Sequence, residues 1–299
     1  MLQYWLGLIF ALLASMLHAG ANILDGIIVG DNTKPLGPII FLYSALNTLS
    51  LPIICLLDFP KALPLDLLGI VGLIASIEVL YQYPYLHALR AEETSVVTAL
   101  FSLGKFLTPL FALVVLRESL GFTQYLGFAL IVSACAALAF DFTKFRPHTS
   151  WWWMLIVSSL LSLQAVLYKY AFANGAGLGT VVLWSTVLEL AITSSILVYS
   201  RKLHFLRGQL AQKTATVPLV ALGQLLTFGG TIVGLYSFLF VPVSVSNGLQ
   251  EFQGVFVLIL GLILSNNYQH PKPPGKHIGI KLLLMLVAGV GAWFLAVHP

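Results

Sequence analysis

The chain has 299 residues, of which 59% are hydrophobic and 9% are charged, and its mean hydropathy is +0.94. A soluble domain carries about 25% charged residues, so this composition excludes a water-soluble globular protein. The formal net charge of +4 does not indicate nucleic-acid binding, because the basic residues lie mostly between apolar runs, where they orient a membrane protein.

Apolar runs of about 20 residues follow one another along the chain, and this is the length of a helix that crosses a bilayer. The alternating ten-residue pattern of membrane barrel strands is absent from the sequence. We therefore predict an all-α membrane protein. Its ten transmembrane helices are expected at residues 2–24, 36–57, 66–88, 94–116, 120–140, 151–172, 178–200, 215–239, 242–264 and 276–297.

Two halves of the chain resemble each other. "LHALRAEETSVVTAL" (86–100) aligns with "LYSFLFVPVSVSNGL" (235–249) at an offset of 149 residues, and "LGPIIFLYSALN" (36–47) aligns with "LGTVVLWSTVLE" (178–189). We predict a five-helix repeat at 1–142, a linker at 143–149 and a second repeat at 150–299. Because five is odd, the second repeat must enter the membrane inverted. Inverted repeats are typical of secondary transporters, whose site lies near the midplane between the repeats.

The stretch "TPLFALVVLRESLGFTQYLGFALIVSA" (108–134) carries Pro109 in the fourth helix, Glu118 after it and Gly127 in the fifth. With the 5+5 layout, the chain resembles the drug/metabolite transporter superfamily in its EamA-like branch, over essentially its full length. The second half departs from this pattern, because Leu258 replaces Pro109 and no Glu follows the ninth helix. The resemblance implies ten helices around a central cavity and movement of small metabolites, amino acids, organic cations or nucleotide-sugars.

The ninth helix, "NGLQEFQGVFVLILGLIL" (247–264), contains a glutamate within an apolar run. A charged side chain at the bilayer centre costs roughly 2.5–3.5 kcal/mol on insertion scales. Glu251 lies one helical turn after Asn247. The offset of 149 residues places Ser102 of the fourth helix on Glu251, and Lys105 follows Ser102 by three residues. We predict that both helices face a shared cavity. Glu251 and Lys105 then take part in binding or coupling, or they form a structural ion pair between the helices.

Other polar residues share helix faces near these positions. Glu78, Gln82 and Tyr85 follow one face of the third helix, and Glu189 lies on the seventh with Trp184 nearby. Acidic groups with aromatic rings suit an organic cation, whereas a lysine beside a glutamate suits a zwitterion, and the sequence leaves both open. The candidate substrate-binding or coupling residues are Glu251, Glu78, Glu189, Lys105, Gln82, Asn247, Tyr85 and Trp184.

The sequence contains no G-x-x-x-x-G-K-[ST], no H-E-x-x-H and no G-x-S-x-G motif. We therefore predict no cofactor, no metal site and no enzymatic activity.

The expected function is secondary-active transport of a small polar metabolite, organic cation or amino acid, driven by a proton or solute gradient. A non-transporting membrane scaffold or accessory subunit is the main alternative, and a membrane enzyme is a second. The expected partners are a small solute, the lipid bilayer and protons, but not nucleic acid, and the protein is expected to be a monomer or homodimer.

The distribution of basic residues bears on orientation in the membrane, which is expected to be the cytoplasmic (inner) membrane. Segments after even-numbered helices hold Lys61, Arg117 and Lys169. Segments after odd-numbered helices hold Lys34, Arg90, Lys144, Arg146, Arg201, Lys202, Arg207, Lys213, Lys272 and Lys276. The positive-inside rule then places both termini outside the cytoplasm, whereas the resemblance implies cytoplasmic termini.

Overall fold

The computed structural model describes residues 2–29, 36–92, 94–138, 150–200, 216–264 and 278–297. Its α-helices are α1 (Leu2–Val29), α2 (Leu36–Asn47), α3 (Leu51–Leu57), α4 (Leu65–Ala91), α5 (Thr94–Leu100), α6 (Thr108–Leu116), α7 (Phe122–Leu138), α8 (Trp151–Ala173), α9 (Leu178–Tyr199), α11 (Thr216–Ser237), α12 (Val243–Gln250), α13 (Gln253–Leu264) and α14 (Ile278–Val297). Two 3₁₀ segments, η1 (Thr48–Ser50) and η2 (Phe101–Leu107), continue the helices on either side of them. The predicted linker at 143–149 lies outside the described residues.

Eight helical segments of the described chain are long and apolar enough to cross a membrane. The other two, α7 and α14, contain shorter apolar stretches, Phe122–Ala134 and Leu286–Leu295. Large apolar side chains such as Leu56, Val114 and Leu286 are exposed on the outside of the bundle, as expected where lipid replaces water. The chain is a multi-pass α-helical membrane protein.

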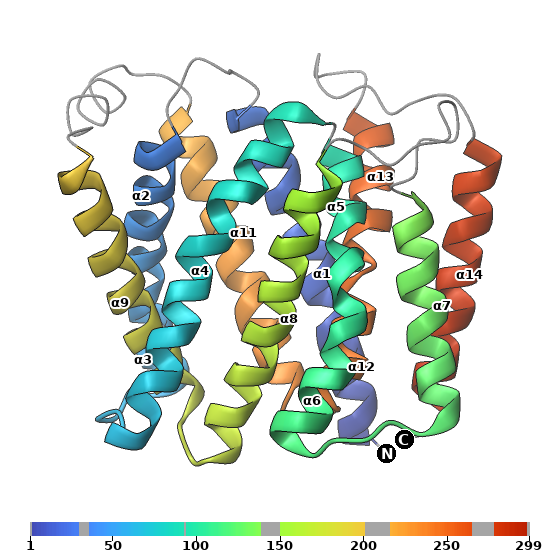
Figure 1. The fold of residues 1–299 in the computed structure, drawn as a ribbon, viewed down its shortest axis with the longest axis horizontal. Helices are drawn as coiled ribbons and strands as arrows, with labels where there is room; N and C mark the ends of the chain where they lie inside the picture. Colours follow the sequence, from blue (N-terminus) through green and yellow to red (C-terminus); the bar gives the residue numbers. More distant parts are fainter. Residues whose placement is uncertain are drawn as a thin grey trace.

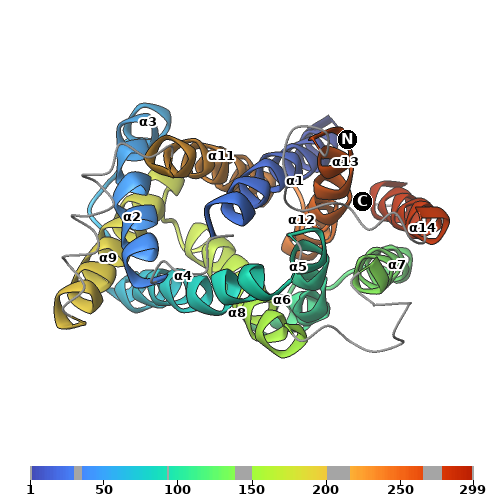
Figure 2. The ribbon, with the colours of Figure 1, turned by 90° about the horizontal axis from the view of Figure 1, so that it is seen from above.

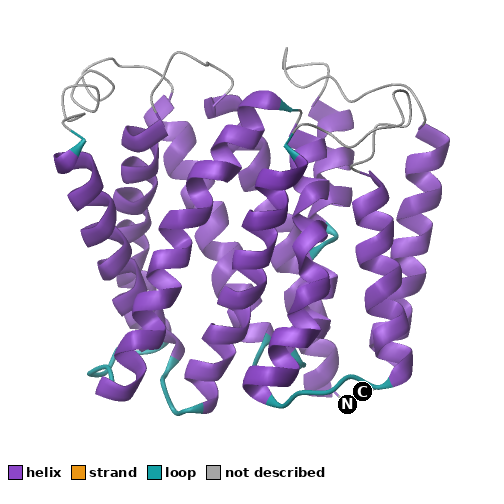
Figure 3. Ribbon diagram, viewed as in Figure 1, coloured by secondary structure: helices purple, strands orange, loops and turns teal. Residues whose placement is uncertain are grey.

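The helices run side by side in an elongated bundle (Figures 1 and 2). In Figure 2, α2 and α9 lie at one end of the bundle, and α7 and α14 lie at the other. The start of α1 and the end of α14 lie at the same face, together with the described loops at 58–64, 117–121 and 174–177 (Figure 3). We call this the terminal face.

The contact between α7 and α14 depends on two glycines. A Cβ on Gly127 would lie 2.6 Å from the carbonyl oxygen of Gly291, and a Cβ on Gly291 would lie 2.7 Å from that of Gly127. Either methyl group would push the backbones apart. Small residues permit this close approach of membrane helices, which gives Gly127 of the family-like stretch a packing role.

Two helices that the sequence predicts as continuous are interrupted. Between α5 and α6, the seven residues of η2 form a 3₁₀ segment, an unusual length for that conformation. Pro109 follows it and has no N–H for the carbonyl of Lys105, which instead accepts the N–H of Thr108. Between α12 and α13, the N–H of Glu251 bonds to Gly248 and that of Gly254 bonds to Glu251, again with three-residue spacing.

Candidate functional site

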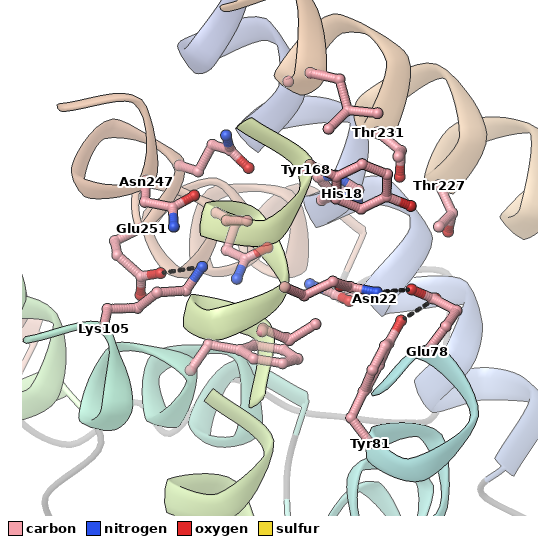
Figure 4. A pocket seen from close by; sticks show the side chains of 18 of the residues that line it. His18, Asn22, Glu78, Tyr81, Lys105, Tyr168, Thr227, Thr231, Asn247 and Glu251 are labelled. Carbon is pink, nitrogen blue, oxygen red and sulfur yellow. Dashed lines mark hydrogen bonds and ion pairs between the residues drawn. The ribbon is translucent and has the colours of Figure 1, made fainter. Parts of the chain in front are cut away.

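A cavity of about 180 Å³ lies inside the bundle, and we call it the first cavity (Figure 4). Side chains of α1, α4, η2, α8, α11, α12 and the α12–α13 break line it, so both halves of the chain contribute. Its lining includes His18, Asn22, Asp25, Glu78, Tyr81, Tyr85, Lys105, Gln164, Tyr168, Thr227, Thr231, Asn247 and Glu251. Polar side chains dominate this set, although the outer surface of the same helices is apolar.

A second cavity of about 80 Å³ adjoins the first. The residues that line both cavities are Asp25, Glu78, Tyr81, Tyr85, Tyr168, Thr227 and Thr231. The second cavity extends toward α2 and α9, where Tyr43, Asn47, Gln82, Ser185 and Glu189 complete its wall. The two cavities therefore form a continuous polar region with acidic groups along it.

Lys105 and Glu251 meet in the wall of the first cavity. The Lys105 Nζ lies 3.7 Å from Glu251 Oε1, and the two side chains are 9% and 1% exposed. Both belong to the interrupted parts of their helices, η2 and the α12–α13 break. In Figure 4 the Asn247 side chain points toward this pair. Its Nδ2 atom is buried and has no acceptor among the described residues.

Glu78 and Glu189 lie further along the polar region and are held by neutral donors. Tyr81 donates its hydroxyl to Glu78 Oε1 at 2.8 Å, and Gln164 Nε2 donates to Glu78 Oε2 at 2.7 Å. Glu189 Oε1 accepts from Ser44 Oγ at 2.6 Å and from Gln82 Nε2 at 3.3 Å. These bonds fix each carboxyl group at the cavity wall, and none of the donors among the described residues is a lysine or arginine.

Asp25 lines both cavities and was missed by the sequence analysis. Tyr43 donates its hydroxyl to Asp25 Oδ1 at 2.7 Å, and the Tyr85 hydroxyl lies 3.0 Å from Oδ2 and 2.9 Å from Asn22 Oδ1. The predicted first helix ended at residue 24, whereas α1 continues to Val29. The sequence could have indicated Asp25, because the helical spacing of His18, Asn22 and Asp25 puts all three on one face.

Trp184 does not belong to the site as the sequence predicted. The residue is 37% exposed and lies outside both cavities, and its indole N–H donates toward the carbonyl of Lys61 at 3.5 Å. The neighbouring Ser185 lines the second cavity instead. Adjacent helical residues point about 100° apart, so only one of the two can face the interior.

The predicted polar face of the fourth helix is also corrected. Lys105 reaches the first cavity, but Ser102 does not line it and bonds to the carbonyl of Ala99. Side chains at i and i+3 of a 3₁₀ segment eclipse each other, so the two residues share a face of η2. The short Ser102 hydroxyl bonds back to its own chain, whereas the longer Lys105 side chain extends to the cavity. The other predicted site residues, Glu78, Gln82, Tyr85, Glu189, Asn247 and Glu251, line one or both cavities.

A second lysine–glutamate pair lies at the terminal face. Lys169 Nζ lies 2.6 Å from Glu118 Oε1 and donates to the carbonyl of Val241 at 2.9 Å. Glu118 Oε2 accepts the N–H of Val243, the first residue of α12, at 3.2 Å. At the same face, Asp58 Oδ2 accepts the N–H of Gly179 in the first turn of α9 at 2.8 Å. A carboxylate at a helix N-terminus is favoured by the unpaired N–H groups there.

No family model and no curated protein matches the chain. Among solved structures, 28 chains match. One of them, a crystal structure, superimposes with a TM-score of 0.61 over 94% of this chain and 95% of its own, at 13% sequence identity. At this identity the likeness shows a shared fold, and it shows nothing about the solute or the mechanism.

Proposed function

We propose that the protein is a secondary-active transporter of the drug/metabolite transporter type, EamA-like, which moves a small polar solute across the cytoplasmic membrane. The solute is a metabolite, an organic cation or an amino acid, and a proton or solute gradient drives it. The observation that carries the proposal is the first cavity, in which ionisable side chains from both halves surround about 180 Å³ of space inside an apolar bundle. Ionisable groups at membrane depth usually mark a solute or ion pathway.

The packing pattern supports two inverted five-helix repeats. Helix α1 packs against α11, and α4 packs against α8. In the predicted repeat, α1 corresponds to α8 and α4 corresponds to α11. Exchange of the two halves therefore turns the α1–α11 pair into the α8–α4 pair. The α4–α9 pair likewise becomes the α11–α2 pair. Three further pairs, α2 with α9, α5 with α13 and α7 with α14, each join a helix to its own counterpart. A two-fold axis in the membrane plane would produce this pattern, with the site on the axis.

The interrupted helices support the same proposal. The offset of 149 residues places Ser102 of η2 on Glu251 of the α12–α13 break, so matching helices are interrupted at matching points. Discontinuous helices at a repeat interface are typical of secondary transporters, because they bring polar backbone groups to the solute. Lys105 and Glu251 lie at these interruptions and face the first cavity.

Contacts at the terminal face suit a transporter that opens to each side in turn. The Glu118–Lys169 pair and the bond from Gly179 to Asp58 join helix ends from the two halves of the chain. Contacts of this kind are polar, local and partly exposed, so they can break without loss of the core. We infer that they hold this face closed in the present conformation.

Reconstituted protein in proteoliposomes tests the proposal. We expect saturable uptake of radiolabelled amines, amino alcohols or amino acids by counterflow, above that of protein-free vesicles. Glu251→Gln should abolish uptake, while Asp66→Asn, an equivalent change at an exposed residue at the start of α4, should retain it. Folded wild-type protein that moves no solute of the panel would favour the scaffold or accessory-subunit alternative.

A further inference from the structure

Carboxyl groups without a compensating base line the second cavity. Asp25, Glu78 and Glu189 belong to its wall, and its lining among the described residues contains no lysine, arginine or histidine. The donors that hold these groups are tyrosine, serine, glutamine and asparagine side chains. Neutral donors orient a carboxylate without cancelling its charge, and buried charges are normally paired. The cavity therefore favours a positive charge, on which each carboxylate acts through the low-dielectric interior even without direct contact.

Glu189 is the carboxyl group with the weakest set of bonds on one of its oxygens. Its Oε1 accepts from Ser44 Oγ at 2.6 Å and from Gln82 Nε2 at 3.3 Å. Its Oε2 accepts from Asn47 Nδ2 at 3.5 Å, which is longer than the usual N–H···O distance of about 2.7–3.2 Å. A stronger donor in the cavity would therefore gain a bond to this carboxylate.

Gln82 supplies a second acceptor beside Glu189. Its side chain is buried and lines the second cavity. Its Nε2 donates to Glu189, so the other atom of the amide is the oxygen. That oxygen, Gln82 Oε1, has no hydrogen-bond partner among the described residues. A buried acceptor without a donor is costly, and a ligand that donates hydrogen bonds would satisfy it.

These two acceptors are close enough for a single nitrogen atom to reach both. In an amide, C=O and C–N bonds of about 1.2 and 1.3 Å place the oxygen about 2.3 Å from the nitrogen. Since Gln82 Nε2 lies 3.3 Å from Glu189 Oε1, Gln82 Oε1 lies within about 5.6 Å of the same carboxylate atom. A nitrogen about 2.8 Å from each acceptor spans up to that separation. An ammonium group has three N–H donors and can bond to both acceptors at once, whereas a hydroxyl group has one donor.

The size and the aromatic lining of the cavity limit what carries this ammonium group. The space of about 80 Å³ holds several water-sized groups, since one water needs roughly 10–15 Å³ on the same measure. Tyr43, Tyr81, Tyr85 and Tyr168 also line it, and aromatic faces attract ammonium groups. A primary ammonium group on a short carbon chain fits this space, and a bulky ring system does not.

We propose that the second cavity is a binding site for a primary ammonium group, which donates to Glu189 and to Gln82 Oε1 near the negative charges of Asp25 and Glu78. Both contacts lie in this one cavity, so the site needs no contact in the first cavity. The inference rests on the proposed transport function in naming a small primary amine as the solute. Binding of the amine is measured separately from flux.

Equilibrium dialysis of the purified protein in detergent tests the inference, with radiolabelled ethylamine, ethanol, acetate and glycine as probes. We expect saturable binding of ethylamine, which is protonated at about pH 7. Ethanol lacks the charge, acetate has the opposite charge, and glycine adds a carboxylate beside Glu189. Each should bind at least roughly tenfold more weakly than ethylamine, because a charged hydrogen bond is lost or opposed. Any of the three binding as tightly as ethylamine would overturn the proposal.

Two variants test the two contacts of the ammonium group. Glu189→Gln should weaken ethylamine binding roughly ten- to hundredfold, the usual effect of losing a charged hydrogen bond. Gln82→Met removes the orphan acceptor with little change in size and should weaken binding roughly two- to tenfold, the effect of losing a neutral acceptor. The matched controls Asp66→Asn and Gln3→Met change exposed residues outside both cavities and should leave the affinity unchanged. Wild-type affinity in Glu189→Gln or in Gln82→Met would contradict the site, and the probe series on the wild-type protein decides if a variant does not fold.

Binding and flux separate the two proposals. If ethylamine binds as expected but proteoliposomes accumulate no solute, the ammonium site stands and the transport function fails. If the protein transports solutes but binds ethylamine no better than ethanol, the transport function stands and the ammonium site fails.

Discussion

Two lysine–glutamate pairs in this protein differ in almost every physical respect. The Glu118–Lys169 pair lies at the terminal face, is separated by 2.6 Å, and its side chains are 24% and 18% exposed. Each member also bonds to the backbone at Val241 or Val243. The Lys105–Glu251 pair lies in the cavity wall, is separated by 3.7 Å, and is almost fully buried.

Under the proposed transport function, the difference distinguishes an ion pair that holds the structure together from one that takes part in binding or coupling. The Glu118–Lys169 pair has short bonds to the chain around it, so it holds helix ends together. The Lys105–Glu251 pair is longer and faces open space, so a solute or a shift of η2 can change it. A buried pair contributes little net stability after desolvation, which leaves a role in binding or coupling as the better reason for its presence.

The largest expected effect comes from splitting the buried pair. Lys105→Met leaves Glu251 buried without its lysine, and loss of one partner of a buried pair typically destabilises by about 3–5 kcal/mol. Thermal or denaturant unfolding in detergent measures this change. The double variant Lys105→Met/Glu251→Leu should recover most of the stability but no transport. Recovery of uptake in the double variant would show that the pair is structural only.

Asp25→Asn should separate stability from function in the uncompensated carboxyl groups. Asp25 is held by Tyr43 and Tyr85 rather than by a base, and an amide can keep one of these bonds. We expect unfolding to change by about 1 kcal/mol, the usual net value of a hydrogen bond, while uptake of solute is lost. Uptake at the wild-type rate would remove Asp25 from the pathway.

The pair at the terminal face should contribute less than the buried pair. Glu118→Gln keeps an acceptor for the N–H of Val243 but loses the ion pair, so we expect destabilisation of about 0.5–1 kcal/mol. If the pair holds this face closed, cysteines placed at positions 119 and 239 should react faster with a membrane-impermeant thiol reagent in the variant. Equal labelling rates with and without Glu118 would mean that other contacts close this face.

The fold was largely predictable from the sequence because apolar runs report helix length directly. The predicted helix at 36–57 matches α2, η1 and α3, and the one at 178–200 matches α9 to within one residue. The interruption at η2 was not predicted, since a single proline such as Pro109 is compatible with a continuous membrane helix as well as with a 3₁₀ segment. The hydropathy of the segment is the same in both cases.

The candidate site was predictable only where the helical spacing of residues determines which side chains share a face. Glu78, Gln82 and Tyr85 share a face in the sequence and line the second cavity together. Asp25 was missed because it follows the expected end of the first helix by one residue. Arg117, next to Glu118 in the sequence, adopts a left-handed conformation with φ of 56°, and the ion-pair partner of Glu118 is Lys169. Lys169 comes from another helix, and only the tertiary fold brings it there.

The smallest expected effect is that of salt, and it sharpens the comparison of the two pairs most directly. At 0.15 M ionic strength the screening length is about 8 Å, and it shortens to about 3 Å at 1 M. Screening acts on exposed charges, so salt should reduce the contribution of the Glu118–Lys169 pair by a few tenths of a kcal/mol. The Lys105–Glu251 pair is almost fully buried and should keep its contribution. The measurement is the destabilisation caused by Glu118→Gln and by Lys105→Met, each at low and high salt. A decrease confined to Glu118→Gln fits this assignment, whereas an equal decrease in both would mean that ions from solution reach the first cavity.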